Sequence, residues 1–207
     1  MTDPDFWSKE APGYAKKKVP DEAAYRQTLD RTRGHLSATD HVLEIGCGTG
    51  TTALLLAPDC AHITATDYAE GMIRIAREKA AAEGANNVRF EVATPETAPP
   101  REGGYDAVLA FNFLHLVPDV QGTLDAVHRH LKPGGLFISK SGCVKEMNIG
   151  LRLILPLLKW IGKAPYVNVF TRDDLRADVE RAGFEIIDAG GIPDEASTNY
   201  FIVARRR

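Results

Sequence analysis

The chain has 207 residues, of which 44% are hydrophobic and 26% are charged, a composition typical of one folded globular domain. Its net charge of −3 and pI near 6.1 argue against a nucleic-acid partner, because phosphate binding requires a concentrated basic face. Three cysteines without metal-ligand spacing are typical of a reducing compartment, and the acidic start MTDPDFWSKE does not resemble a signal peptide. We therefore expect a cytoplasmic protein with a single domain over residues 1–207.

Residues 1–36 precede the first predicted strand and are expected to form an N-terminal flap followed by a helix. The segment from Asp21 to Leu36 (DEAAYRQTLDRTRGHL) has the composition of an amphipathic helix, and Asp21 is a plausible N-terminal cap.

A short apolar strand then ends in three glycines at alternate positions, Gly46, Gly48 and Gly50, within the stretch HVLEIGCGTG. Glycine permits the positive backbone angles of a tight turn and lets a ligand lie against the main chain. The next segment, Thr51 to Ala57, is helical in pattern, so its free N–H groups would face the same ligand. The pattern predicts a nucleotide site, but NAD, FAD and S-adenosylmethionine all remain compatible with it.

Strands and helices alternate through the rest of the chain. The expected strands are 62–68, 88–93, 105–111 and 136–141, and the expected helices are 69–84, 120–135 and 171–184. Such alternation predicts right-handed crossovers and a parallel sheet covered on both faces, with ligands at the carboxyl ends of the strands. The last two strands, FEIIDAG and TNYFIVARR, are joined by a short connection that permits an antiparallel pair.

Between these elements, residues 142–170 form an insertion rich in leucine, isoleucine and tryptophan. Its apolar stretch, Ile149 to Ile161, is too short and too interrupted by charged residues to span a bilayer, so we expect no stable membrane insertion. Two interpretations are open: a lid over a largely apolar acceptor, or a helix pair that packs on the sheet or on a second subunit in a homodimer.

Four motifs occur in a fixed order: VLEIGCGTG, TATDYAEGMI, YDAVLAFNFLHLV and LKPGGLFIS. In this order they resemble the class I S-adenosylmethionine-dependent methyltransferases, especially the small-molecule branch similar to the ubiquinone and menaquinone C-methylases. The resemblance implies an α/β fold: a Rossmann-like, doubly wound, seven-stranded sheet, mostly parallel with an antiparallel last strand. It also implies S-adenosyl-L-methionine as the cofactor.

Two acids carry the cofactor prediction. Asp67 closes the second strand roughly 20 residues after the loop, where a carboxylate can accept both hydroxyls of a ribose. Glu44 lies inside the first strand, where a buried acid is costly unless it is hydrogen-bonded. The resemblance places it beneath the glycine loop, near the methionine moiety; the alternative is a residue at the wet end of the strand.

The resemblance extends to further positions around the cofactor. Tyr68 and Met72 look like residues that flank the adenosine, although Met72 also fits the core face of its helix. Thr94 stands where many relatives carry aspartate, so the adenine contact would fall to its hydroxyl, to the main chain or to Glu96. The remaining predicted cofactor residues are Cys47 in the loop, Phe111 and Asn112 at the methionine end, and the flap tyrosine Tyr14.

Methyl transfer needs little side-chain chemistry, because the sulfonium is a good leaving group and the enzyme mainly holds the nucleophile in line. His115 is the histidine that the fold argument places at the ligand edge, as a general base, as a pocket wall or as a core residue. We predict no metal. The expected function is methylation of a small, apolar or aromatic acceptor. A nicotinamide-dependent oxidoreductase and a non-catalytic S-adenosylmethionine-binding protein are the alternatives.

Overall fold

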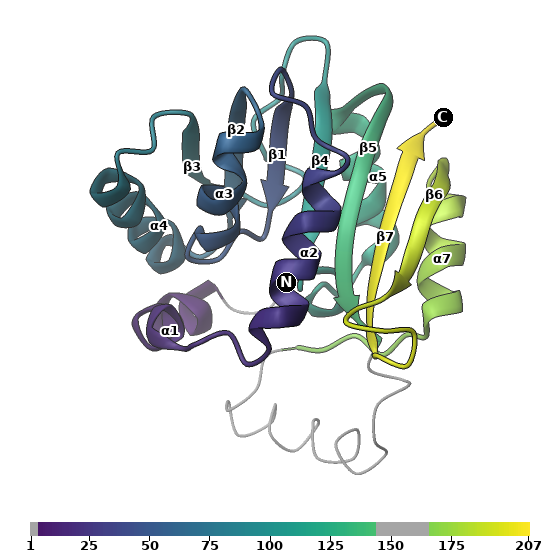
Figure 1. Cartoon of the computed structure of the whole chain (residues 1–207), viewed down its shortest axis with the longest axis horizontal. Helices are drawn as coiled ribbons and strands as arrows, with labels where there is room; N and C mark the ends of the chain where they lie inside the picture. The colour runs from purple at the N-terminus through teal and green to yellow at the C-terminus, as the bar shows by residue number, and fades with distance from the viewer. Residues whose placement is uncertain (1–3, 144–165) are drawn as a thin grey trace.

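The computed structural model describes residues 4–143 and 166–207, which form a seven-stranded sheet with helices on both faces (Figure 1). The strands are β1 (His41–Ile45), β2 (His62–Asp67), β3 (Val88–Val92), β4 (Tyr105–Phe111), β5 (Leu131–Gly142), β6 (Phe184–Gly191) and β7 (Asn199–Arg206). The helices are α1 (Pro4–Lys16), α2 (Glu22–Arg33), α3 (Thr51–Leu56), α4 (Glu70–Glu83), α5 (Val120–His130) and α7 (Arg172–Arg181), with 3-10 turns η1 (Ala57–Asp59) and η2 (Leu114–Leu116).

The sheet has the strand order β3-β2-β1-β4-β5-β7-β6. Strands β1 to β5 pair in parallel, whereas β7 runs antiparallel to both of its neighbours, β5 and β6. The predicted mostly parallel sheet with an antiparallel last strand is therefore confirmed.

Strand β1 is the point at which the winding of the sheet reverses. The chain passes from β1 to β2 and β3 on one side, and later continues through β4 and β5 on the other. Doubly wound sheets bind ligands in the crevice at such a switch point, outside the carboxyl ends of the strands. In Figure 1 these strand ends lie at the lower edge of the sheet, where α1 is also found.

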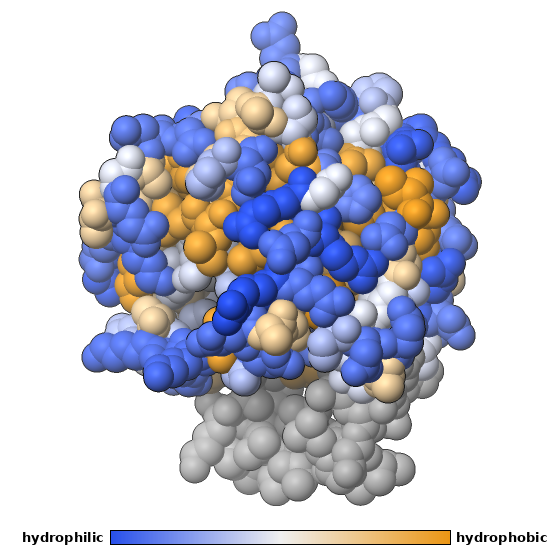
Figure 2. Space-filling view, viewed as in Figure 1, coloured by the Kyte–Doolittle hydropathy of each residue, from blue (hydrophilic) through white to orange (hydrophobic). Residues whose placement is uncertain are grey.

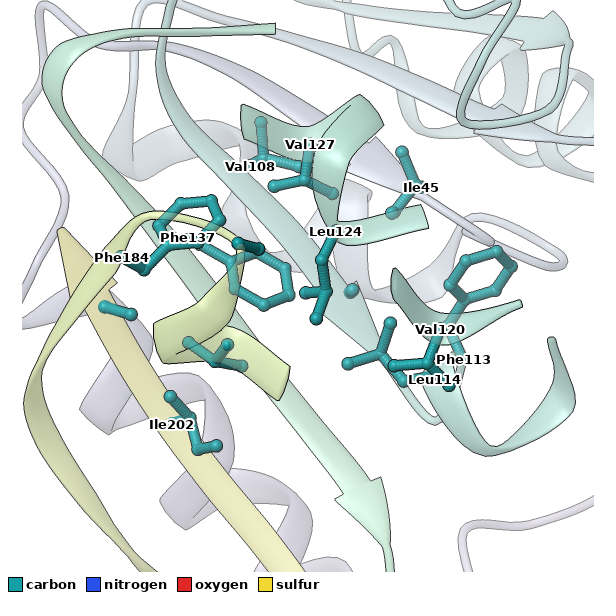
Figure 3. Packing of buried hydrophobic residues seen from close by; sticks show 14 of the residues in the cluster. Ile45, Val108, Phe113, Leu114, Val120, Leu124, Val127, Phe137, Phe184 and Ile202 are labelled. Carbon is teal, nitrogen blue, oxygen red and sulfur yellow. The ribbon is translucent and has the colours of Figure 1, made fainter. Parts of the chain in front are cut away.

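Each face of the sheet has its own hydrophobic core, because alternate residues of each strand point to opposite faces. One core packs α5 and α7 on the sheet, and Figure 3 shows Leu124 and Val127 of α5 close to Val108 of β4. In the same core the rings of Phe137 and Phe184 lie 5.7 Å apart. The other core packs α2, α3 and α4 on the opposite face.

The N-terminal flap is itself helical, which the sequence pattern did not indicate. Helix α1 packs on α4, where the Gly71 N–H donates to the Ser8 hydroxyl at 3.2 Å. A Cβ at Gly71 would lie 2.6 Å from the Ser8 carbonyl oxygen, so this close approach requires glycine.

Helix α2 begins as predicted, because the Asp21 side chain accepts a hydrogen bond from the Ala24 N–H at 2.9 Å. Figure 2 shows hydrophilic side chains along the middle of the face that α2 crosses, with hydrophobic residues to either side. The buried residues of α2, Ala24, Thr28, Leu29 and Thr32, face the sheet instead. The helix therefore covers one side of the crevice with its inner face.

The helix predicted in the segment 120–135, with Pro133 and two glycines as its stop, ends a few residues earlier than predicted. Helix α5 stops at His130, and residues 131–135 already belong to β5, where Leu131 pairs with Tyr105. Pro133 has no N–H, and Gly134 adopts a φ of +76°, so neither continues a helix. Most of the predicted insertion, residues 144–165, lies outside the described residues. Within the described ranges, no helix has the length and apolar character needed to cross a bilayer.

Candidate active site

A cavity of about 270 Å³ opens at the carboxyl ends of the parallel strands. Its walls include the glycine loop, helices α1, α2 and α4, the segments that follow β2, β3 and β4, and the carboxyl end of β5. The lining includes every predicted cofactor residue except Gly50, namely Tyr14, Glu44, Gly46, Cys47, Gly48, Asp67, Tyr68, Met72, Thr94, Glu96, Phe111 and Asn112. The structure thus brings together residues that are distant in the sequence, while their roles toward a cofactor stay predictions.

The glycine loop adopts the backbone that only glycine accepts readily. Gly46, Gly48 and Gly50 have φ values of +67°, +55° and +77°. A Cβ at Gly46 would lie 2.2 Å from the Phe113 ring, and one at Gly50 would lie 2.7 Å from the Phe90 ring. At Gly48 the nearest contact would be the Tyr14 ring at 3.9 Å. Gly50 therefore serves packing, whereas Gly48 leaves the main chain open toward the cavity.

Asp67 is held in place by two backbone donors. Its Oδ2 accepts from the Gly48 N–H at 3.0 Å and its Oδ1 accepts from the Ala69 N–H at 2.9 Å. Burial raises the pKa of Asp67, and these two hydrogen bonds oppose the rise. A carboxylate can accept about four hydrogen bonds, so a fixed Asp67 keeps acceptor capacity for hydroxyls in the cavity.

Glu44 is the most perturbed acid of the site. It is only 2% exposed, and its Oε2 has no hydrogen-bond partner among residues 4–143 and 166–207. Burial, followed by the nearby charge of Asp67, raises the pKa of Glu44 to about 8. A buried oxygen without a partner is rare in folded proteins and marks a place where a ligand group can supply the missing contact.

The walls around the loop are aromatic and apolar. Tyr14 of α1 reaches the glycine loop, and its ring meets the Trp7 ring edge-on at 6.3 Å. Met72 is 3% exposed and packs with Ala11 of α1, yet it also lines the cavity. Met72 is thus a core residue that also borders the cavity, and its place beside the adenosine stays a prediction.

Thr94 and Glu96 lie in the loop after β3, at the edge of the cavity. The Thr94 N–H donates to the Thr97 hydroxyl at 3.0 Å, and the two threonine hydroxyls lie 3.2 Å apart. Thr94 is thus bonded to its own loop and offers no carboxylate toward a ligand.

Asn112 follows β4 with a φ of +52°, the left-handed region that residues other than glycine rarely adopt. Its N–H donates to the Lys140 carbonyl at 2.7 Å, which ties this turn to β5. The turn brings Phe111 and Asn112 to the cavity wall. Strained backbone of this kind tends to occur at functional sites.

His115 does not line the cavity. It lies in η2, where burial lowers its pKa to about 4 and its Nδ1 has no hydrogen-bond partner within the described part of the chain. Its carbonyl accepts a hydrogen bond from the Asn168 N–H at 2.7 Å. The general-base role of His115 stays a prediction. Across the described residues, no group of three or more histidine, cysteine or acidic side chains is placed to hold a metal.

Sequence reasoning missed three wall residues on the α2 side, Tyr25, Thr28 and Lys140. The Tyr25 hydroxyl lies 3.0 Å from the Thr52 hydroxyl at the start of α3. Lys140 is 8% exposed, and its Nζ donates to the Thr28 hydroxyl at 3.2 Å. A signal for Lys140 was present, because a lysine interrupts the apolar strand LFISKS.

The comparisons with known proteins agree with this geometry. A family model described as a methyltransferase domain matches residues 42–135. The chain is 32% identical over 165 residues to malonyl-[acyl-carrier protein] O-methyltransferase of Geobacter sulfurreducens, which covers 77% of this chain and 60% of that protein. It is 28% identical over 182 residues to ubiquinone biosynthesis O-methyltransferase of Acinetobacter baylyi, which covers 85% of this chain and 76% of that protein.

Among solved structures, a SAM-dependent methyltransferase of Methanosarcina mazei superposes with a TM-score of 0.71 at 21% identity, covering 85% of this chain and 96% of that one. At this identity the likeness establishes the fold. The chain spans between 40% and 62% of the length of the first curated relatives that it matches. Residues 42–135 match the methyltransferase-domain model, and the motif order and sheet topology of the chain resemble those of the class I S-adenosylmethionine-dependent methyltransferases.

Proposed function

We propose that this protein is a methyltransferase that uses S-adenosyl-L-methionine to methylate a small molecule. One observation supports this proposal most strongly. An open glycine loop and two buried acids, Glu44 and Asp67, line the same cavity at the switch point of the sheet. The relatives named above are methyltransferases, which supports the same reaction class.

The residues of the cavity suit this cofactor. S-adenosylmethionine carries an ammonium group, a sulfonium and a ribose, and the unpartnered Oε2 of Glu44 suits the ammonium. Asp67 is fixed by backbone donors with acceptor capacity to spare, which suits the ribose hydroxyls. Gly48 leaves room for the ligand to lie against the main chain. When bound, the cofactor supplies an activated methyl group on a positively charged sulfur.

The chain's own contribution is positioning and the exclusion of water. Helices α1 and α2 place Trp7, Tyr14 and Tyr25 on the walls of the cavity, so the reacting centre is covered by aromatic side chains. Holding a nucleophile in line with a good leaving group accounts for a large part of the rate of such reactions. Burial lowers the pKa of His115 to about 4, which makes it a weak base, and His115 is not among the described residues that line the cavity, so this mechanism assigns it no proton transfer.

The acceptor is proposed to have an apolar or aromatic body. Besides the aromatic residues of α1 and α2, the wall includes Phe113, Leu116 and Val117 after β4. Small-molecule sites typically combine such apolar walls with a few placed polar groups.

A crystal structure with S-adenosylhomocysteine tests the proposal. We expect the ribose at Asp67, the amino group at Glu44, and free space beside the sulfur bordered by Phe113 and Leu116. The shape and polarity of that space would delimit the acceptor. A nicotinamide dinucleotide bound in the same cavity, or S-adenosylhomocysteine bound elsewhere at saturating concentration, would contradict the proposal.

A further inference from the structure

Lys140 is a charged residue buried in the wall of the cavity. It lies near the carboxyl end of β5, is 8% exposed, and has the Thr28 hydroxyl as the partner of its Nζ. Throughout the part of the chain that the structure describes, no carboxylate forms an ion pair with it; Asp21 acts on it only through space. An ammonium group removed from water is costly unless an opposite charge compensates for it.

The acidic and basic residues of the cavity lie on different parts of its wall. Of the charged residues that line it within the described ranges, Glu44, Asp67, Glu96 and Asp119 are acids and Lys140 is the one base. The sheet register separates the two signs. Glu44 of β1 pairs with Leu109 of β4, which pairs with Ile138 of β5. Lys140 lies two residues beyond Ile138 and so shares a face with Glu44, with β4 between them.

We propose that Lys140 and Thr28 form an anion subsite that anchors a carboxylate group of the methyl acceptor. This inference rests on the proposed function. The acids near the glycine loop suit a positively charged cofactor, whereas Lys140 supplies a positive charge near the carboxyl end of β5, on the other side of β4. The acceptor is then amphipathic, with an apolar body and one anionic end. The hydroxyl of Thr28, on α2, orients the ammonium group of Lys140. Burial lowers the pKa of Lys140, and a bound anion would offset this effect by favouring the charged form.

A binding experiment with matched probes tests the subsite. Benzoate and its uncharged isostere benzamide are titrated calorimetrically into protein saturated with S-adenosylhomocysteine. We expect the wild type to prefer benzoate by about tenfold or more, the range of a hydrogen bond to a charged group. Lys140→Met keeps the length of the side chain and removes its charge, so it should abolish the preference. Equal affinity of the wild type for both probes, or a preference that survives Lys140→Met, would overturn the proposal.

Lys132→Met is the matched control. Lys132 belongs to the same strand but lies at the opposite end, where it pairs with Asp106 and is 47% exposed. This variant should keep the benzoate preference of the wild type. Lys140→Met is expected to fold with unchanged or higher stability, because it removes a buried charge. Should it not fold, Thr28→Val removes the hydroxyl partner and is expected to weaken benzoate binding without affecting benzamide.

A second experiment tests whether the carboxylate that binds Lys140 belongs to the acceptor or to the cofactor. S-adenosylmethionine and its decarboxylated analogue differ by the α-carboxylate alone. If Lys140→Met weakened binding of the first and spared the second, the anion would be the cofactor's own and the acceptor assignment would be wrong. We expect both affinities to be unchanged. Failure of the wild type to bind S-adenosylhomocysteine would instead refute the proposed function, and the two probes would then be compared on the ligand-free protein.

Discussion

Replacing Glu44 with glutamine is expected to stabilise the ligand-free protein while weakening its affinity for S-adenosylmethionine. Both effects have the same cause. The buried site disfavours the negative charge of Glu44 in the ligand-free protein, and the ammonium group of the bound cofactor would compensate for that charge. Burial raises the pKa of this carboxyl from 4.5 to about 8 in the folded protein.

The sign of the stability effect follows from the two pKa values. Below pH 4.5 the carboxyl is protonated in both states, and the full stability is present. Between pH 4.5 and about 8 the unfolded chain ionises while the folded protein stays neutral, so the free energy of unfolding falls as pH rises. The loss is about 1.4 kcal/mol for each pH unit, or about 3 kcal/mol at pH 7.

Glutamine has nearly the same shape and does not titrate, so Glu44→Gln escapes this loss. Urea denaturation of both proteins between pH 4.5 and 8 measures the difference. We expect the advantage of the variant to grow with pH toward about 3 kcal/mol at pH 7. A difference that does not change with pH, or a variant less stable than the wild type throughout, would refute the reasoning.

The same carboxyl links cofactor binding to protons. An ammonium group beside Glu44 favours the ionised form, so binding at pH 7 should release about 0.9 proton, the protonated fraction for a pKa about one unit above the pH. Calorimetry in buffers of different ionisation enthalpy measures this release. The Glu44→Gln variant should release none and should bind about 10- to 100-fold more weakly, the usual effect of losing a charged hydrogen-bond partner.

Three further predictions concern other parts of the site. Asp67→Ala should weaken S-adenosylhomocysteine binding by about 1 to 3 kcal/mol in calorimetry, and unchanged affinity would count against the ribose assignment. Gly50→Ala should lower the free energy of unfolding in urea by about 2 kcal/mol or more, because φ is +77° and the new methyl would meet the Phe90 ring; equal stability would contradict this packing. The His115 ring signals in NMR should not titrate between pH 5 and 8, since its pKa is about 4, whereas a midpoint near 6.5 would show that the ring is not buried.

Local chemistry made the glycine loop and Asp67 predictable. Positive φ angles at Gly46 and Gly48 leave a trace in the sequence because other residues rarely adopt them. An acid that ends a strand beside such a loop has a restricted position, and Asp67 indeed faces the cavity. The strand pattern was equally informative, since buried parallel strands are nearly continuous in apolar residues.

Features that depend on packing between distant elements were not predictable. Tyr25 and Thr28 line the cavity because α2 crosses the sheet at one particular place. Amphipathic spacing predicts which face of a helix is buried, but it does not predict which element that face packs against. The helical pattern over 120–135 failed for a related reason: pairing with β4 draws Leu131 into β5. The position of His115 beside the cavity rather than in its wall likewise depends on the η2 turn.

The most direct test of the central claim is a calorimetric titration of the wild-type protein with S-adenosylhomocysteine, with NADH titrated in parallel. The account predicts one saturable site for S-adenosylhomocysteine, whose affinity falls by about 1 to 3 kcal/mol in the Asp67→Ala variant, and no binding of NADH. Absence of S-adenosylhomocysteine binding, or a saturable site for NADH that depends on Asp67, would contradict it.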